Sequence, residues 1–176
     1  CSSDLNEGQN RGMAYALTNP ATGVVEREFA SATPTEIDSA ITRAHAAHIE
    51  WREWSVADRA KVLATVASIY DERKEELAEI IAREMGKPVR QGRGEAWFVG
   101  EIYKFYAEHG PGHLVDEDMH PLSGGQAIVR SAPLGVLLGI MPWNYPYYQV
   151  ARFAGPNLVL GNTILLKHAS QCPESS

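Results

Sequence analysis

The chain has 176 residues, of which 44% are hydrophobic and 22% charged, so it is long and apolar enough to bury a core. Lysine and arginine number 16 against 22 aspartates and glutamates, a net charge of −6. This balance argues against a nucleic-acid partner and against an anionic membrane surface, since both bind clustered basic residues. The longest apolar stretch, 134–143, is shorter than the roughly 20 residues that cross a bilayer.

The cysteine content also limits the class of protein. Cys1 and Cys172 are the only two cysteines, too few for a disulfide framework and without the Cys-x-x-Cys spacing of a zinc site. Lone thiols are typical of a reducing compartment, so we expect a cytoplasmic protein without a metal site. Residues 1–12 are polar and carry no pattern, and we expect a leader or tag without ordered structure.

Two short strands and a helix are expected first. Residues 15–17 and 24–29 flank a segment, 19–23, with the residue types of a tight turn. Thr33 and Glu36 then form a capping box that starts a helix. His45 and His48 share one face of that helix, and two histidines without a carboxylate partner are more often solvated than bound to a metal.

Two further helices are predicted from their start and stop signals. The second begins at Ser55 and ends at Gly86, a glycine that suits a left-handed C-cap before proline. The third covers 89–109 and ends at Gly110. We expect the Trp and Tyr residues of the first and third helices in the core. The expected buried face of the third helix consists of Trp97, Phe98, Ile102, Phe105 and Tyr106.

The remaining sequence predicts strands again. Residues 114–115 and 127–129 flank an acidic and glycine-rich segment and predict a hairpin or a pair of long strands. The apolar run 134–141 is typical of a strand buried on both faces. A helix over 146–160 and a strand over 163–166 complete a βαβ unit. The chain is therefore of the α/β class, with the first βαβ unit of a Rossmann-like parallel sheet.

Candidate functional residues follow the two parallel strands, where open α/β sheets bind their ligands. Asn144 comes directly after the first strand, between two prolines. Its amide could stabilise a developing oxyanion, or it could simply cap the next helix. Lys167 ends the second strand and could reach a ribose or phosphate, although a charged residue is also ordinary at a strand end.

Five ordered motifs resemble the aldehyde dehydrogenase superfamily, most of all its bacterial NADP-dependent succinate-semialdehyde dehydrogenases. They are Asn19-Pro20-Ala21-Thr22-Gly23, Glu84-Met85-Gly86-Lys87-Pro88, Pro133-Leu134-Gly135-Val136, Pro142-Trp143-Asn144 and Leu166-Lys167-His168-Ala169-Ser170. The resemblance extends from about Tyr15 to the last residues. It implies the N-terminal part of that fold, as a fragment of about a third of such an enzyme.

The resemblance assigns roles to residues at both strand ends. It implies that Asn144 binds the oxyanion of the tetrahedral intermediate and that Met141 and Trp143 line the nicotinamide end of the cofactor. Lys167 matches a lysine that binds the adenosine ribose. Ser170 stands where many NAD-preferring members have a glutamate. The implied cofactor is NADP, with NAD as the alternative.

The resemblance also implies a substrate and an incomplete site. Arg152 matches an arginine that binds the carboxylate of succinate semialdehyde. The nucleophilic cysteine and the general-base glutamate of the family have no counterpart, and Cys172 does not match that cysteine. We therefore expect this chain alone to be inactive. Another semialdehyde or a broad range of aldehydes is the alternative substrate, and a non-catalytic truncated remnant is the alternative function.

The expected organisation has four parts. A leader or tag covers 1–12, and a helical part of the cofactor-binding domain covers 13–113. The hairpin at 114–132 resembles the family's oligomerisation element, so we expect a homo-oligomer in the full-length form. An incomplete NAD(P)-binding βαβ unit covers 133–176. The expected partners are a small aldehyde substrate and further copies of the chain, with no nucleic acid and no membrane.

Overall fold

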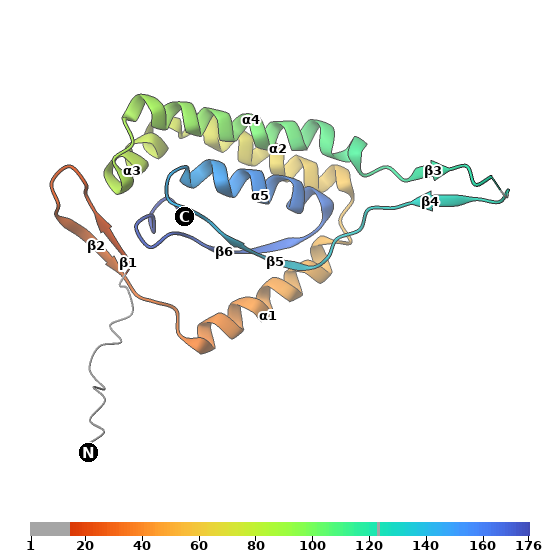
Figure 1. Ribbon diagram of the computed structural model, residues 1–176, viewed down its shortest axis with the longest axis horizontal. Helices are drawn as coiled ribbons and strands as arrows, with labels where there is room; N and C mark the ends of the chain where they lie inside the picture. The colour runs from red at the N-terminus through yellow and green to blue at the C-terminus, as the bar shows by residue number, and fades with distance from the viewer. Residues whose placement is uncertain (1–14, 123) are drawn as a thin grey trace, which may run out of the picture.

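The computed structural model describes residues 15–122 and 124–176, so the leader or tag predicted for 1–12 lies outside the described residues. Helices α2, α3 and α4 lie on one side of α5, the β5–β6 sheet lies on its other side, and α1 lies beyond the sheet (Figure 1). In chain order the elements are β1 (Tyr15–Thr18), β2 (Val25–Phe29), α1 (Pro34–Trp51), α2 (Val56–Glu72), α3 (Lys74–Met85), α4 (Val89–His113), β3 (Glu117–Met119), β4 (Ala127–Val129), β5 (Val136–Ile140), α5 (Pro146–Leu160) and β6 (Thr163–Lys167).

The first elements form as the sequence predicts. β1 and β2 pair antiparallel, and Gly23 closes the turn between them with a φ of 72°. The Glu36 amide donates to the Thr33 hydroxyl at 3.3 Å, and the Thr33 amide donates to the Glu36 carboxylate at 2.8 Å. This capping box satisfies two amides that the first turn of α1 would otherwise leave without a partner.

The single helix predicted from Ser55 to Gly86 is two helices, so that prediction is wrong. α2 ends at Glu72, Arg73 has a φ of −102° and ψ of 14°, and α3 starts at Lys74. The bend lets both helices pack on α4 although they point in different directions (Figure 1). The apolar spacing continues across the bend, so the sequence pattern does not reveal it. Gly86 ends α3 with a φ of 75°, as predicted.

The central helix is α4, which packs against α2, α3 and α5. Ala96, Val99 and Tyr103 form part of its buried face. Val99 and Tyr103 join Leu63 of α2 and Ile81 of α3 in the core. These contacts fix the position of α4 relative to α2 and α3.

The buried face predicted for this helix is largely wrong. Trp97, Phe98 and Phe105 are 55%, 47% and 48% exposed, and Trp54 after α1 is also exposed. The buried positions of α4 instead carry mostly small side chains, Gly92, Ala96 and Gly100 among them, with Tyr103 as the large ring. A Cβ added at Gly92 would lie 3.0 Å from the main-chain Cα of Ala78 in α3, so α4 approaches α3 too closely there for a larger residue.

The end of α4 and the hairpin differ in detail from the prediction. α4 continues past the predicted end at Gly110 to His113, with Pro111 inside its last turn. The first hairpin strand is Glu117–Met119, inside the predicted acidic segment rather than at 114–115. An ion pair between Arg130 and Asp116, with Nε–Oδ1 at 2.9 Å, holds the base of the hairpin.

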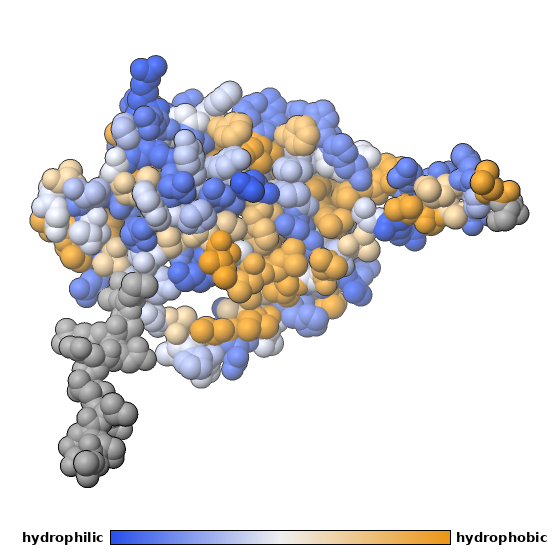
Figure 2. All heavy atoms as spheres, viewed as in Figure 1, coloured by the Kyte–Doolittle hydropathy of each residue, from blue (hydrophilic) through white to orange (hydrophobic). Residues whose placement is uncertain are grey.

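The predicted βαβ unit is confirmed: β5 and β6 pair in parallel and α5 connects them. The expected burial of the apolar run on both faces is wrong for this chain, because Leu134, Leu138 and Ile140 are exposed. Figure 2 shows apolar side chains gathered in the middle of the molecular surface seen in that view. In Figure 1, β5 lies there between α5 and α1. Within the described ranges, no helix has both the length and the apolar character needed to span a membrane.

Two glycines on α4 give a test of its close packing. A Cβ at Gly92 would lie 3.0 Å from the main-chain Cα of Ala78, whereas a Cβ at Gly94 would meet nothing within 4 Å. We expect Gly92→Ala to destabilise the protein by about 1–3 kcal/mol. Gly94→Ala should stabilise it by up to about 1 kcal/mol, the ordinary helix gain. Urea unfolding followed by fluorescence measures both, and equal shifts would contradict this packing.

Candidate functional site

The candidate residues come together at one edge of the β5–β6 sheet. Ile140 at the end of β5 is in register with Lys167 at the end of β6, so both strands end side by side. Met141, Trp143 and Asn144 follow β5 directly, and Ser170 follows β6 by three residues. Five of the six residues predicted for the site therefore lie on two adjacent chain segments, and Arg152 lies on α5.

Two contacts join these segments to one another. The Met141 amide donates to the Lys167 carbonyl at 3.0 Å, which continues the strand pairing by one bond. The Cys172 thiol donates to the Trp143 carbonyl, with an S–O distance of 3.7 Å. Burial raises the pKa of Cys172 to about 12, so the sulfur stays protonated at neutral pH. Cys172 is a structural hydrogen-bond donor and not a nucleophile.

The side chain of Asn144 does not cap α5, so the capping alternative is wrong. The N-cap of α5 is Tyr145, and no side-chain cap bond is made from it. Asn144 is exposed, and among the described residues only its main-chain oxygen takes part in a hydrogen bond. Its amide group is therefore available to a ligand.

A carboxylate from α4 takes the place of a cap. Glu95 accepts hydrogen bonds from the Tyr147 and Tyr148 amides at 3.0 and 3.2 Å. Its other oxygen forms an ion pair with Lys87, and the two side chains are only 1% and 6% exposed. A negative charge at this position also suits the positive end of the helix dipole. The first turn of α5 is thus satisfied from inside the protein.

The other end of α5 is held by side chains from α1 and α2. Arg59 is buried and donates from Nε to the Val159 carbonyl at 2.9 Å, and Trp51 donates from Nε1 to the Leu158 carbonyl at 2.9 Å. A ring nitrogen of His48 lies 3.1 Å from the Gly161 carbonyl. The expectation that His48 is solvated is therefore wrong, since it is buried in this contact, while His45 is exposed.

Of the predicted cofactor residues at and after the end of β6, Lys167 is exposed and Ser170 is half-buried. The Lys167 ammonium lies 5.4 Å from the ring centroid of Tyr15. The hydroxyl of Ser170 is within 3.4 Å of the Gln171 side-chain oxygen. His168 between them is buried, and burial lowers its pKa. Its Nδ1 accepts a bond from the Ala169 amide at 2.9 Å, so it adds no positive charge at neutral pH.

Arg152 lies two turns along α5 from this edge. Its guanidinium carbon is 5.8 Å from the ring centroid of Tyr148, which also stacks on Phe98 and packs edge-on against Tyr145. A row of aromatic rings therefore connects Arg152 with the residue next to Asn144. Within 15–122 and 124–176, no carboxylate forms a salt bridge with Arg152.

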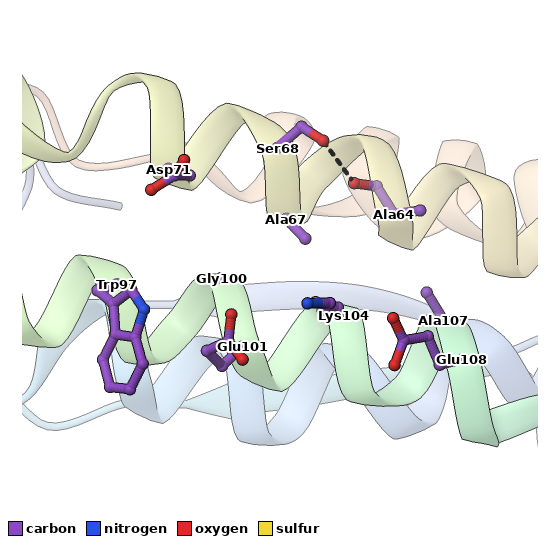
Figure 3. Close-up of a pocket in the computed structure, with 10 residues that line it drawn as sticks. All are labelled: Ala64, Ala67, Ser68, Asp71, Trp97, Gly100, Glu101, Lys104, Ala107 and Glu108. Carbon is purple, nitrogen blue, oxygen red and sulfur yellow. Dashed lines mark hydrogen bonds between the residues drawn. The ribbon is translucent and has the colours of Figure 1, made fainter.

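A separate groove between α2 and α4 contains none of the candidate residues. Figure 3 shows Ala64, Ser68 and Asp71 of α2 facing Gly100 and Lys104 of α4 across it. The Ser68 hydroxyl donates a hydrogen bond to the Ala64 carbonyl of its own helix at 3.2 Å. This groove is open and mixed in charge, and it lies apart from the sheet edge. Elsewhere too, the described residues bring no three His, Cys, Asp or Glu side chains together as a group that could hold a metal ion.

Comparison with known proteins identifies the family. The aldehyde dehydrogenase family model matches residues 7–176, nearly the whole sequence. The chain therefore belongs to the aldehyde dehydrogenase family, as the sequence motifs predict. The fold corresponds to the N-terminal part of aldehyde dehydrogenase structures.

Several relatives carry a more specific name. The NADP-dependent succinate-semialdehyde dehydrogenase of Deinococcus radiodurans is 46% identical over 162 residues, which are 92% of this chain and 34% of that protein. That of Mycobacterium bovis is 39% identical, over 92% of this chain and 36% of its own length. The structure of the succinic semialdehyde dehydrogenase of Streptococcus pyogenes, in complex with NADP+, is 34% identical in sequence and superposes with a TM-score of 0.89. The match covers 92% of this chain and 36% of that protein. The chain thus spans about a third of the length of these relatives.

The sequence analysis does not predict the buried charges around α5. Glu95 and Arg59 both lie among apolar residues of a buried helix face. Glu95 precedes Ala96 and stands four residues before Val99. A charge within such a face indicates a buried partner, because an isolated buried carboxylate is costly.

Proposed function

We propose that this chain forms the oxyanion-binding and part of the dinucleotide-binding region of an enzyme that oxidises succinate semialdehyde to succinate with NADP+. The names of the relatives support the substrate and the cofactor. The observation that carries the proposal is the exposed side chain of Asn144. Its amide has no hydrogen-bond partner among the described residues, while its main-chain oxygen accepts a hydrogen bond from Lys87.

Asn144 is the donor that this edge offers to an oxyanion. The N-terminus of α5 would otherwise attract an anion, but its Tyr147 and Tyr148 amides already bind Glu95. A neutral amide stabilises negative charge as it develops on the carbonyl oxygen of the substrate without attracting anions beforehand. We therefore assign oxyanion stabilisation to the Asn144 side chain.

The residues after β6 fit a phosphorylated dinucleotide. Lys167 offers an exposed ammonium at the sheet edge, and Ser170 offers a hydroxyl in place of a carboxylate. They would hold the ribose and its 2′-phosphate, with Met141 and Trp143 toward the nicotinamide end. The bound dinucleotide would supply a hydride acceptor. NAD remains the alternative cofactor.

The remaining roles fall to other residues. Arg152, without a carboxylate partner among the described residues, would bind the far carboxylate of the substrate. Cys172 cannot supply the nucleophile, because it is buried and protonated. The nucleophile and the base would come from another part of the whole enzyme. The β3–β4 hairpin would serve in assembly with further copies, since Ile128 and Val129 are exposed on it.

The role of Asn144 can be tested in the full-length enzyme that contains this sequence. Asn144→Ala should lower kcat by about 10²–10³, because an oxyanion donor acts in the transition state. KM for the aldehyde should change much less. Steady-state kinetics measures both, and an unchanged kcat would remove Asn144 from the chemistry.

The substrate assignment depends on Arg152. Arg152→Ala should raise KM for succinate semialdehyde, because a charge-assisted bond to the carboxylate is lost. Oxidation of an uncharged aldehyde of similar length by the same variant is the control and should be little affected. Equal effects on both substrates would make Arg152 structural and favour a broader range of aldehydes.

The cofactor assignment depends on Ser170. Ser170→Glu should weaken the use of NADP much more than that of NAD, because a carboxylate would repel the 2′-phosphate. The ratio of kcat/KM for the two cofactors measures this change. If that ratio stays the same, cofactor choice is set elsewhere in the enzyme.

A further inference from the structure

The buried ion pair of Lys87 and Glu95 has no part in the function proposed so far. Lys87 belongs to a motif, 84–88, to which the family resemblance assigned no role. It follows Gly86, the left-handed C-cap of α3, and precedes Pro88, the N-cap residue of α4. Its backbone is therefore fixed on both sides, and its side chain points into the protein with only 6% of its surface exposed.

The ammonium of Lys87 contacts the loop that carries Asn144. It donates to the main-chain oxygen of Asn144 at 3.1 Å and lies 3.7 Å from the ring centroid of Tyr145. Its charge is balanced by Glu95, which at the same time binds the first turn of α5. One pair of charges thus holds both Asn144 and the helix that follows it.

We propose that Lys87 is a positioning residue for Asn144, which it holds by the main-chain carbonyl so that the side-chain amide meets the oxyanion. This inference rests on the proposed function of Asn144. A donor displaced by about 1 Å can lose as much as 10²-fold in rate, so a residue that never touches the substrate can affect kcat strongly.

A purely stabilising role is the competing explanation, and the two differ in what charge removal does. Loss of one partner leaves the other charge buried and unpaired, which destabilises a fold. Loss of both charges together costs little stability. Positioning of Asn144, however, needs the ammonium itself. Removal of both charges should therefore restore stability without restoring catalysis.

The first experiment is a double-mutant cycle in the full-length enzyme. Lys87→Met should lower kcat between about 10- and 100-fold and leave KM for NADP+ unchanged. The same change added to Asn144→Ala should lower kcat less than about threefold further, because its effect passes through Asn144. Lys61→Met, which removes an exposed lysine paired with Asp58 on α2, is the control and should leave kcat unchanged.

The second experiment uses Lys87→Met with Glu95→Gln, in which the glutamine oxygen can still accept the α5 amides. This variant should recover most of the thermal stability that Lys87→Met loses, while kcat stays low. It also serves as the first variant of the cycle if Lys87→Met does not fold. Both results together support positioning.

The outcomes separate this inference from the proposed function. If kcat recovers along with the melting temperature, or if the Lys87 and Asn144 effects multiply, Lys87 is only structural and the inference is overturned while Asn144 keeps its role. If Asn144→Ala alone leaves kcat unchanged, the proposed role of Asn144 is overturned, and the inference falls with it.

Discussion

The arrangement of this protein depends on how the two ends of α5 are satisfied. Glu95 of α4 binds the first turn, and Arg59 of α2 binds the carbonyls of the last turn. A carboxylate at the positive end and a guanidinium at the negative end both match the helix dipole. Because these charges come from other helices, α5 has one position and direction relative to α4 and α2.

The strands that precede and follow α5 in the chain are held in place by further side-chain contacts. Asn162 after α5 accepts from the Leu134 and Gly135 amides before β5, at 2.6 and 3.0 Å. At the opposite edge, Glu84 accepts from the Glu174 and Ser175 amides at 2.5 and 3.0 Å. The end of α3 and the turn that follows it therefore contact the chain after both strands, through Glu84 the segment beyond Ser170 and through Lys87 the loop of Asn144.

Local signals in the sequence predicted much of this fold. The capping box at Thr33, the C-cap at Gly86 and the βαβ unit each depend on residues near one another in the chain, and all three are confirmed. The bend at Arg73 and the true buried face of α4 were missed, because they depend on how closely helices approach. The sequence predicted that Asn144 lies at the sheet edge, because it comes directly after a strand. It did not predict Glu95 and Lys87, which hold the loop of Asn144 from distant segments of the chain.

The contacts that shape the Asn144 loop have a consequence for folding. They join residues 57 and 52 positions apart, from Lys87 to Asn144 and from Glu95 to Tyr147. Such long-range contacts form only after the intervening chain has closed, so the local sequence alone does not fix the final position of the loop. The loop is completed when α4 and α5 dock. A transient opening between these two helices would release the first turn of α5 together with the loop, because Glu95 of α4 binds that turn.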